Sequence, residues 1–509
     1  MTIIDLSREA APPDLLVDAV IIGSGSGGAI AARNLAKAGW DIVVIDEGSN
    51  RSGASLTQRD GTMYDQLYMD RGGRATTDLS ISVLQARVLG GGGVINAADV
   101  VPMHEGVLDL WHRQFGLSDI SEVSLAAARE TVLADLQASR PKADELNTNN
   151  QLLAAGTAEM GWLGEIMMHN RVGCTGLGTC LIGCPIDAKR HVGQSAIPQA
   201  ISLGARIMCR ARAMLIRNGH DEIKEVVVEP LDVDGYRPTG QFSIRARHVV
   251  VAANAVNTPS ILQRSGLGNA MVGSNLMLQP QLPLLAVFDQ PVRAFEGMPQ
   301  NFAVTQFEEN HHAKHGWWGF RIEAIAGTIG ITSTLLPFIG HEGKEWMVRT
   351  AQIGGCLLLC PDSASGRVRS LSNGRTMIEY QINDELRIRL RDAIEAAAQI
   401  WFAAGARQVL VPTSPPLLLQ SPKDFDSIAG LGFQPASSPF LSAHQMGTTR
   451  MSANPNEGAV SPDGSLFGAN GIWIMDTSVF PSSPSSHTMT PVMTLAQHLS
   501  SQLAHQHRP

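Results

Sequence analysis

The sequence is poor in charge, in aromatic side chains and in cysteine. Of its 509 residues only 17% are charged and 5% are aromatic, and the formal net charge is -8. Binding to nucleic-acid phosphates needs clustered Lys and Arg, which this sequence does not show, so a nucleic-acid partner is excluded. Six cysteines are too few for a disulfide framework in a chain of this length. The expected partner is a small molecule.

Long apolar runs are also missing. The N-terminus carries Asp5, Arg8, Glu9 and Asp14 without a continuous apolar stretch, so we expect no signal peptide and a cytoplasmic protein. Export with a partner subunit or peripheral membrane association stays open. The weakly polar stretch 324–340 contains three glycines and a proline and is too short to span a membrane. We expect no transmembrane segment, and we expect this stretch to be buried core or a pocket wall.

A dinucleotide-binding fingerprint lies near the N-terminus. Residues 17–22 predict a buried strand, the glycine-rich turn 23–28 follows, and residues 29–38 have a helical pattern that ends at Gly39. A second strand over 41–48 carries an acid, Glu47, where a ribose would bind. The order predicts a β-α-β unit that binds a dinucleotide.

The glycines of this turn have separate expected roles. Gly23 permits the tight turn, Gly25 lets the backbone approach a pyrophosphate, and Gly28 allows close packing of helix on strand. A second glycine-rich stretch, 90–96, would let more main chain press against an extended cofactor. The less favoured alternative for that stretch, taken alone, is a mobile loop.

With these motifs the chain resembles the glucose–methanol–choline (GMC) oxidoreductases, flavoproteins that oxidise alcohols. The resemblance implies FAD as cofactor and a Rossmann-like FAD-binding domain of the p-hydroxybenzoate-hydroxylase type. The matching segments occur in the family's order: 23–47, 90–96, 248–255, 258–267, 444–448, 475–481 and 485–496.

The resemblance also implies roles for individual residues. His444 falls on the family's catalytic base, and His487 on the position that assists it, which is His or Asn in the family. Imidazole has a suitable intrinsic pKa for accepting a proton near neutrality. Asp476 falls beside the flavin ribityl and pyrophosphate, and the other positions implied to contact FAD are Gly91, Gly92, Gly93, Asn96, Ala213, Ala253, Thr488 and Met489.

Finer likeness points towards the long-chain alcohol oxidases. Residues 273–280, 344–347 and 363–369 look like signatures of that branch. One position departs from the pattern, because Gln279 stands where a histidine is expected. That departure leaves the substrate open, as an apolar alcohol or a sugar.

Three cysteines lie in one glycine-rich segment, in the pattern C-x5-C-x3-C-P. Thiolates this close in sequence suit a soft metal or an iron–sulfur cluster. The segment also resembles the cluster region of FAD sugar dehydrogenases in this family, which implies a three-iron, four-sulfide [3Fe-4S] centre on Cys174, Cys180 and Cys184. The alternatives are a disulfide with one spare thiol, or a zinc site with a fourth ligand from Asp187, His191 or Cys209. Cys356 and Cys360 lie in an apolar run and are expected in the core.

The expected activity is therefore FAD-dependent oxidation of an alcohol to an aldehyde or ketone. Electrons would pass through the cluster to an external acceptor, a protein or a quinone. The alternatives are an oxidase that makes hydrogen peroxide and a lyase of the hydroxynitrile type, in which FAD takes no part in redox chemistry.

Because the motifs are far apart in sequence yet must meet one cofactor, we expect a discontinuous α/β architecture. The FAD-binding domain is predicted from 16–105, 185–275 and 440–505, and an α+β substrate domain on an antiparallel sheet from 106–184 and 276–439. Within the latter, 367–371 and 376–382 predict a hairpin, and 384–404 an amphipathic helix.

Overall fold

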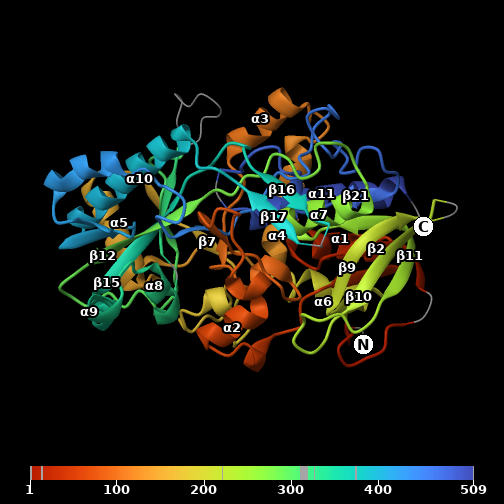
Figure 1. Ribbon diagram of the computed structural model, residues 1–509, viewed down its shortest axis with the longest axis horizontal. Coiled ribbons are helices and arrows are strands. Elements are labelled where there is room, and N and C mark those ends of the chain that lie inside the picture. Colours follow the sequence, from red (N-terminus) through yellow and green to blue (C-terminus); the bar gives the residue numbers. More distant parts are fainter. Residues whose placement is uncertain are drawn as a thin grey trace.

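The structure is a computed structural model of the 509-residue chain. It describes residues 3–12, 15–219, 222–309, 319–325, 327–372, 375–485 and 487–507. Two sheets organise these residues, one on the right of Figure 1 around β2 and β11 and one on the left around β12 and β15. The chain passes between the two sheets several times, so each sheet is built from distant segments.

The first sheet has eight strands, and its centre is parallel. Apolar runs such as that of β2 suit it, because a strand covered on both faces has no polar side. β2 pairs in parallel with β3 on one side and β11 on the other, and β11 also pairs in parallel with β21. The strands are β1 (Ile3–Asp5), β8 (Arg206–Cys209), β3 (Ile42–Asp46), β2 (Leu15–Ile22), β11 (Phe242–Val251), β10 (Lys224–Pro230) and β9 (Ala211–Asn218), with β21 (Ile472–Ile474) beside β11.

Helix α1 (Ser26–Lys37) is the central helix of this part. It is buried from Gly27 to Ala36 and packs against α11 (Met489–Gln506) and α6 (Ala196–Ser202), while α4 (Glu122–Asp135) packs on α11. The first and last thirds of the chain therefore share one core. The expected β-α-β unit is present, and its helix begins three residues earlier than the apolar pattern suggested because glycines Gly27 and Gly28 belong to its first turn.

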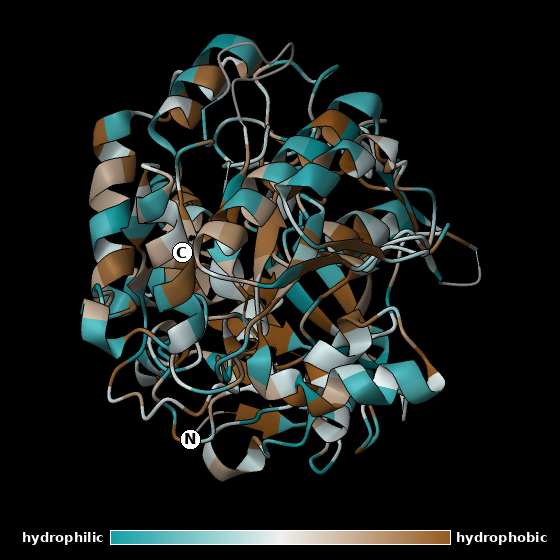
Figure 2. Cartoon of the chain, turned by 90° about the vertical axis from the view of Figure 1, so that its left-hand side faces the viewer, coloured by the Kyte–Doolittle hydropathy of each residue, from teal (hydrophilic) through white to brown (hydrophobic). Residues whose placement is uncertain are grey.

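The second sheet has nine strands and is mostly antiparallel. Its order is β19 (Leu417–Leu419), β18 (Gln408–Val411), β12 (Gln281–Val287), β15 (Ile353–Leu359), β14 (Arg321–Ala324), β13 (Phe302–Val304) and β6 (Gly164–Ile166), with β20 (Phe440–Ser442) joined to β12 and to β4 (Ile81–Val83). Helices α10 (Asp384–Ala403) and α5 (Thr148–Glu159) pack together and against this sheet. Figure 2 shows the apolar strands inside and the hydrophilic faces of helices outside.

Shorter elements complete the described chain. The predicted hairpin is present as β16 (Arg367–Ser370) and β17 (Thr376–Glu379), although its turn residues 373–374 lie outside the described residues. A two-stranded ribbon joins β5 (Asp99–Val100) to β7 (Met168–His169). The remaining helices are α2 (Asp60–Leu67), α3 (Glu105–Phe115), α7 (Asn254–Ser265), α8 (Ile329–Leu335) and α9 (Gly340–Val348).

The α/β fold expected from the sequence is confirmed, with a Rossmann-like part and a mostly antiparallel second sheet. The domain boundaries stay a prediction, and some strands cross them. β4 and β20 lie in stretches assigned to the FAD-binding domain but join the second sheet, and β1 precedes residue 16 yet belongs to the first sheet. Among the described residues no helix is both long and apolar enough to cross a bilayer.

Candidate active site

The glycine-rich turn after β2 is held too tightly for side chains. A Cβ on Gly28 would lie 2.0 Å from the carbonyl oxygen of Gly23, and one on Gly23 would lie 2.3 Å from that of Ala252. Gly23 also has a φ of +100°, which favours glycine. Gly28 therefore allows α1 to pack directly on the strand end, as its place in the fingerprint predicts.

The second glycine-rich stretch lies against the first. A Cβ on Gly91 would approach the Cα of Gly25 to 2.6 Å, and Gly90 N donates to the hydroxyl of Ser24 at 3.0 Å. The ring of His191 packs beneath Gly90 and Gly93. Residues 90–96 thus form a fixed layer against the fingerprint turn, because the backbones of the two glycine-rich stretches are in contact.

A cavity of about 1160 Å³ runs along these glycines and between the two sheets. It is long enough to reach from the carboxyl end of β3 to the second sheet, so a dinucleotide could extend along it. Of the residues proposed from the sequence, only Gly28 and the three cysteines do not line it. Those that do are Gly23, Gly25, Glu47, Gly91, Gly92, Gly93, Asn96, Ala213, Ala253, Asp476, Thr488, Met489, His444 and His487.

Two acids near this cavity orient backbone around it. Asp46, not Glu47, accepts hydrogen bonds from the Ser24 backbone (2.8 Å) and hydroxyl (2.6 Å), while Glu47 lines the cavity with Arg212 at 3.6 Å. Asp476 accepts from Asn254 N at 3.0 Å and from Ser478 N at 2.8 Å. Its carboxylate therefore holds together two turns of the cavity wall, a role that the motif alone did not show.

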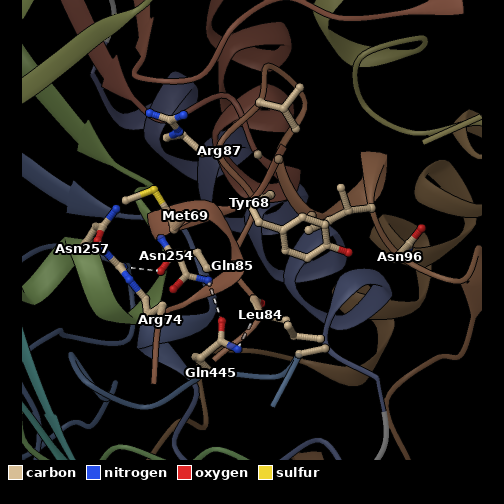
Figure 3. A pocket seen from close by; sticks show the side chains of 18 of the residues that line it. Tyr68, Met69, Arg74, Leu84, Gln85, Arg87, Asn96, Asn254, Asn257 and Gln445 are labelled. Atoms are coloured by element: carbon tan, nitrogen blue, oxygen red, sulfur yellow. Dashed lines mark hydrogen bonds between the residues drawn. The ribbon is translucent and has the colours of Figure 1, made fainter. Parts of the chain in front are cut away.

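A polar wall faces the cavity where α7 begins (Figure 3). Arg74 donates to Gln85 at 2.7 Å and to Asn257 at 3.0 Å, and Asn254 donates to Gln445 at 3.3 Å. These side chains come from three distant parts of the chain, residues 74–85, residues 254–257 and Gln445. Sequence reasoning did not find them, since no local motif marks them.

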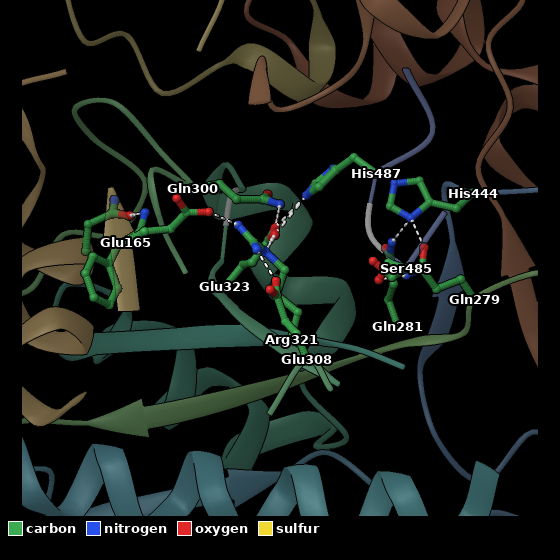
Figure 4. A network of polar contacts seen from close by, with 12 residues as sticks. Glu165, Gln279, Gln281, Gln300, Glu308, Arg321, Glu323, His444, Ser485 and His487 are labelled. Atoms are coloured by element: carbon green, nitrogen blue, oxygen red, sulfur yellow. Dashed lines mark hydrogen bonds and ion pairs between the residues drawn. The ribbon is translucent and has the colours of Figure 1, made fainter. Parts of the chain in front are cut away.

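His444 and His487 face one another across the cavity. Their ring centroids are 5.1 Å apart and the rings are nearly perpendicular, at 71°. Figure 4 shows them with the polar residues behind each ring. The two imidazoles expected to act together therefore lie close in space although they are 43 residues apart in the sequence. The turn after β20 carries His444, and the segment that leads into α11 carries His487.

Behind His444 lie two glutamines. Its Nδ1 is 2.5 Å from the Gln279 amide oxygen and 3.0 Å from the Gln281 amide nitrogen, two contacts that require opposite tautomers. The shorter contact assigns the proton to Nδ1 of His444. The Gln279 amide nitrogen donates to the Ser485 carbonyl, and this orients the amide oxygen of Gln279 towards the ring as an acceptor. Nε2 then carries the lone pair. Burial, with the charge of His487, lowers the pKa of His444 to about 3, so the ring is neutral.

Behind His487 lies Glu323, an entirely buried residue of β14. His487 Nε2 is 2.9 and 2.8 Å from the two carboxylate oxygens of Glu323. Glu323 also accepts from Arg321 Nε at 2.6 Å and from Gln300 Nε2 at 2.8 Å. Burial works against the charged imidazole, yet the carboxylate outweighs it and raises the pKa of His487. The carboxylate thus favours the charged form of His487.

The cysteine segment lies behind the second glycine-rich stretch. The wholly buried Lys189 donates to the carbonyls of Cys180 (2.7 Å), Val94 (2.8 Å) and Asn96 (2.8 Å). Burial lowers the pKa of Lys189 to about 8, while the nearby thiols of Cys180 and Cys184 oppose that shift. Lys189 thereby ties the cysteine segment to the cavity wall.

All six cysteines lie in described parts of the chain, and none forms a disulfide. The structure therefore holds no cysteine pair that would support the alternative of a disulfide with one spare thiol. Cys356 and Cys360 are fully buried, in agreement with a place in the core. Cys209, a possible zinc ligand, is buried in β8 between β1 and β3, and His191 packs under the glycines.

The fold and the cavity are those of a dinucleotide-binding oxidoreductase. The sequence matches the GMC oxidoreductase family, with its N-terminal domain over residues 64–281 and its C-terminal domain over 361–496, and an NAD(P)-binding Rossmann-like domain over 21–84. An uncharacterised GMC-type oxidoreductase of Mycobacterium tuberculosis is 33% identical over 487 residues, which cover 94% of this chain and 74% of that protein. The chain belongs to the GMC oxidoreductase family.

Other relatives and solved structures agree with this placement. A long-chain-alcohol oxidase of Arabidopsis thaliana is 26% identical over 500 residues, covering 94% of this chain and 67% of that protein. The fold resembles pyridoxine 4-oxidase from Mesorbium loti (TM-score 0.71, 16% identity, 96% of this chain and 99% of that one). It also resembles a formate oxidase of Aspergillus oryzae, a protein with a modified FAD (TM-score 0.72, 15% identity, 98% and 99%).

Family membership supports FAD as the cofactor, and the residues present fit it. A Cβ on Gly91 would lie 2.6 Å from the Cα of Gly25, so the two glycine-rich stretches meet backbone to backbone, and residues 25–27 at the N-terminus of α1 line that part of the cavity, where a helix N-terminus suits a pyrophosphate. Glu47 and Ala213 line the cavity beside the strands of the first sheet, and Thr488 and Met489 line it where α11 begins.

Proposed function

We propose that this protein oxidises an alcohol to an aldehyde or ketone, with His444 as the base and His487 as its partner. The observation that carries the proposal is the pairing of a neutral imidazole with a carboxylate-bound imidazole, 5.1 Å apart, in the cavity that the FAD-binding glycines line. FAD, when bound, supplies the acceptor for the hydride that leaves the alcohol carbon.

His444 is suited to take the hydroxyl proton. Its Nδ1–H is fixed by Gln279, so the lone pair of Nε2 is available on the opposite edge of the ring. Burial lowers the pKa of His444 and so leaves this nitrogen unprotonated near neutral pH. Gln279 is held in turn, because its backbone N–H donates to Asp362 at 3.0 Å. The base is thus oriented before the substrate arrives.

His487 is suited to stabilise negative charge on the substrate oxygen. Glu323 occupies its Nε2, so Nδ1 is the nitrogen left to donate to the oxygen as the proton departs. A cationic donor is worth more than a neutral one at a developing alkoxide. The raised pKa of His487 favours the charged form of this donor.

The cavity offers an apolar wall for the body of the substrate. Ile325, directly after β14, and Leu357 of β15 line it, and so do Ile331 and Leu335 of α8. The prediction that the stretch 324–340 forms a pocket wall thus holds for these positions, whereas Ile339 is 90% exposed and Ala326 lies outside the described residues. The long-chain-alcohol oxidases among the relatives favour a substrate with an alkyl part.

For the electrons we propose a [3Fe-4S] cluster on Cys174, Cys180 and Cys184 that passes them to an external acceptor. All three thiols are free, and they lie near enough to influence one another's charge. Their sulfurs do not all lie within 4.8 Å of one another. A tetrahedral zinc with bonds of about 2.3 Å would hold three sulfurs roughly 4 Å apart, so the arrangement is wider than a preformed zinc site. Lys189 supplies positive charge beside the sulfurs, as an anionic cluster requires.

Anaerobic titration tests the proposal directly. Purified protein with FAD should lose its flavin absorbance when mixed with a substrate alcohol, and aldehyde or ketone should appear in equal amount. Iron and sulfide near three and four per chain, with little peroxide in air, would support the dehydrogenase. Peroxide equal to the aldehyde formed would support the oxidase instead, and an unbleached flavin with every alcohol would favour the lyase.

A further inference from the structure

A third acid lies beside His487 and Glu323 without a hydrogen-bond partner among the residues that the structure describes. Asp99 is 3% exposed, and neither of its carboxylate oxygens has a hydrogen bond to those residues. Among the described residues the other buried carboxyls, Glu323, Asp362 and Asp476, are all hydrogen-bonded. A buried polar group without a partner costs free energy, so such a group in a binding cavity points to a ligand that satisfies it.

The position of Asp99 is fixed by its backbone. It opens β5, where it pairs with His169 of β7, and it follows Ala98, whose φ of 71° is rare for a residue with a Cβ. The carboxylate lines the cavity. One of its oxygens, one of Glu323 and a ring nitrogen of His487 lie within 4.8 Å of one another. Asp99 therefore lies beside the His487 ring, in the wall of the same cavity.

The charges around Asp99 do not replace a partner. Burial raises the pKa of Asp99 to about 7, while His487 and Arg171 act in the opposite direction. Arg171 donates instead to Asn301 at 2.8 Å and to the carbonyl of Pro299 at 2.9 Å. Asp99 is thus an acceptor on the cavity side that has no hydrogen-bond donor among the described residues.

We propose that Asp99 is a specificity-determining residue that accepts a hydrogen bond from a hydroxyl or ammonium group on the carbon next to the reacting alcohol carbon. The inference rests on the proposed function, because it takes His487 as the site of the reacting oxygen. With that oxygen at His487, a donor on the adjacent carbon is the group that reaches Asp99. The apolar wall then takes the rest of the molecule, so the substrate class is a 1,2-diol or a 2-amino alcohol with an alkyl body.

This arrangement should discriminate strongly. A site that hydrogen-bonds a substrate group rejects an analogue without it by up to about 10⁴–10⁵, since its own polar group is then left unpaired. A plain alkanol would leave Asp99 buried without a donor. The preference therefore distinguishes this chain from an enzyme for simple long-chain alcohols.

Three matched ligands test the proposal: 1-hexanol, 1,2-hexanediol and 2-amino-1-hexanol. We expect kcat/KM for the diol or the amino alcohol to exceed that for 1-hexanol by at least tenfold, and Asp99→Leu to abolish or reverse the preference by improving the use of 1-hexanol. The diol and the amino alcohol separate the two donors. Asp99→Asn should retain preference for the diol and lose it for the ammonium. Glu308→Gln removes a carboxylate outside the cavity and should leave the ratios unchanged.

Binding keeps this test independent of catalysis. In His444→Ala with FAD bound, dissociation constants are read from the flavin difference spectrum, so the ratio can be measured even if no alcohol bleaches the flavin. Equal binding of the three ligands to this variant and to its Asp99→Leu double variant would overturn the inference. A stoichiometric divalent metal that is lost in Asp99→Leu would also overturn it, because Asp99 would then be a metal ligand.

Discussion

Replacing Glu323 with glutamine should slow alcohol oxidation by about 10²–10³-fold without loss of FAD. The amide has nearly the same shape, and Gln300 and Arg321 can still surround it. What disappears is the charge that holds His487 protonated. Loss of one donor aimed at a developing oxyanion costs about 2.7–4 kcal/mol, which corresponds to that factor.

The pH dependence makes this prediction sharper. The folded-state pKa of His487 is raised by Glu323, so the charged donor is present below that pKa and is lost as pH rises through it. In Glu323→Gln the remaining influences are burial and Arg321, which lower the pKa of His487, and Asp99, which raises it less than Glu323 does in the wild type. The alkaline limb of the kcat profile should therefore move to lower pH. The assay is anaerobic flavin reduction in a stopped-flow instrument, at saturating alcohol.

Glu308→Gln is the matched control. Glu308 also pairs with Arg321 but is not bonded to His487, so this variant changes the same network and should keep the wild-type profile. Breaking a buried ion pair can cost about 3–5 kcal/mol, but in Glu323→Gln Arg321 keeps Glu308 and Glu165, so the loss in stability should be smaller. An alkaline limb that stays in place would refute the role given to His487. A shift confined to the acidic limb would make His487 the base.

Three further predictions follow from the site. His444→Ala should retain FAD yet lose flavin reduction by alcohol by about 10²–10⁴-fold, the range of general base catalysis, and an unchanged rate would remove its role. Gly28→Ala should lower FAD occupancy and the melting temperature, because its Cβ would lie 2.0 Å from the Gly23 carbonyl oxygen; equal FAD content and melting temperature would show that the turn can relax. Cys184→Ser should lose iron and sulfide and slow electron transfer to an external acceptor while flavin reduction continues, and wild-type iron content would contradict the cluster.

Local motifs predicted much of the cofactor end. Gly23, Gly25 and Gly28 lie within six residues of one another, and the geometry that they impose is decided by their immediate neighbours, so sequence is enough to predict it. His444 and His487 were found by resemblance to a family, and the structure brings them together.

The residues behind the histidines could not be found in this way. Glu323 is 164 positions from His487, in a short strand with no motif, and only the packing of β14 brings it there. Asp99 lies three residues from Asn96, yet nothing local shows that its carboxylate lacks a partner. The sequence did single out Gln279, because it occupies a position where a histidine is expected. In the structure its amide oxygen contacts the His444 ring. The cysteine ligands and the domain boundaries stay predictions.

The cavity between the two sheets should affect the stability of the chain before its cofactor binds. Its wall takes residues from Ile22 to Val492, including residues of both sheets, so the two sheets border one continuous hollow. A ligand that fills it and binds only the folded state adds about 2.7 kcal/mol of stability at a hundred times its dissociation constant. Cofactor supply would then govern how long newly made chains survive proteases, and limited proteolysis with and without added FAD would measure that dependence.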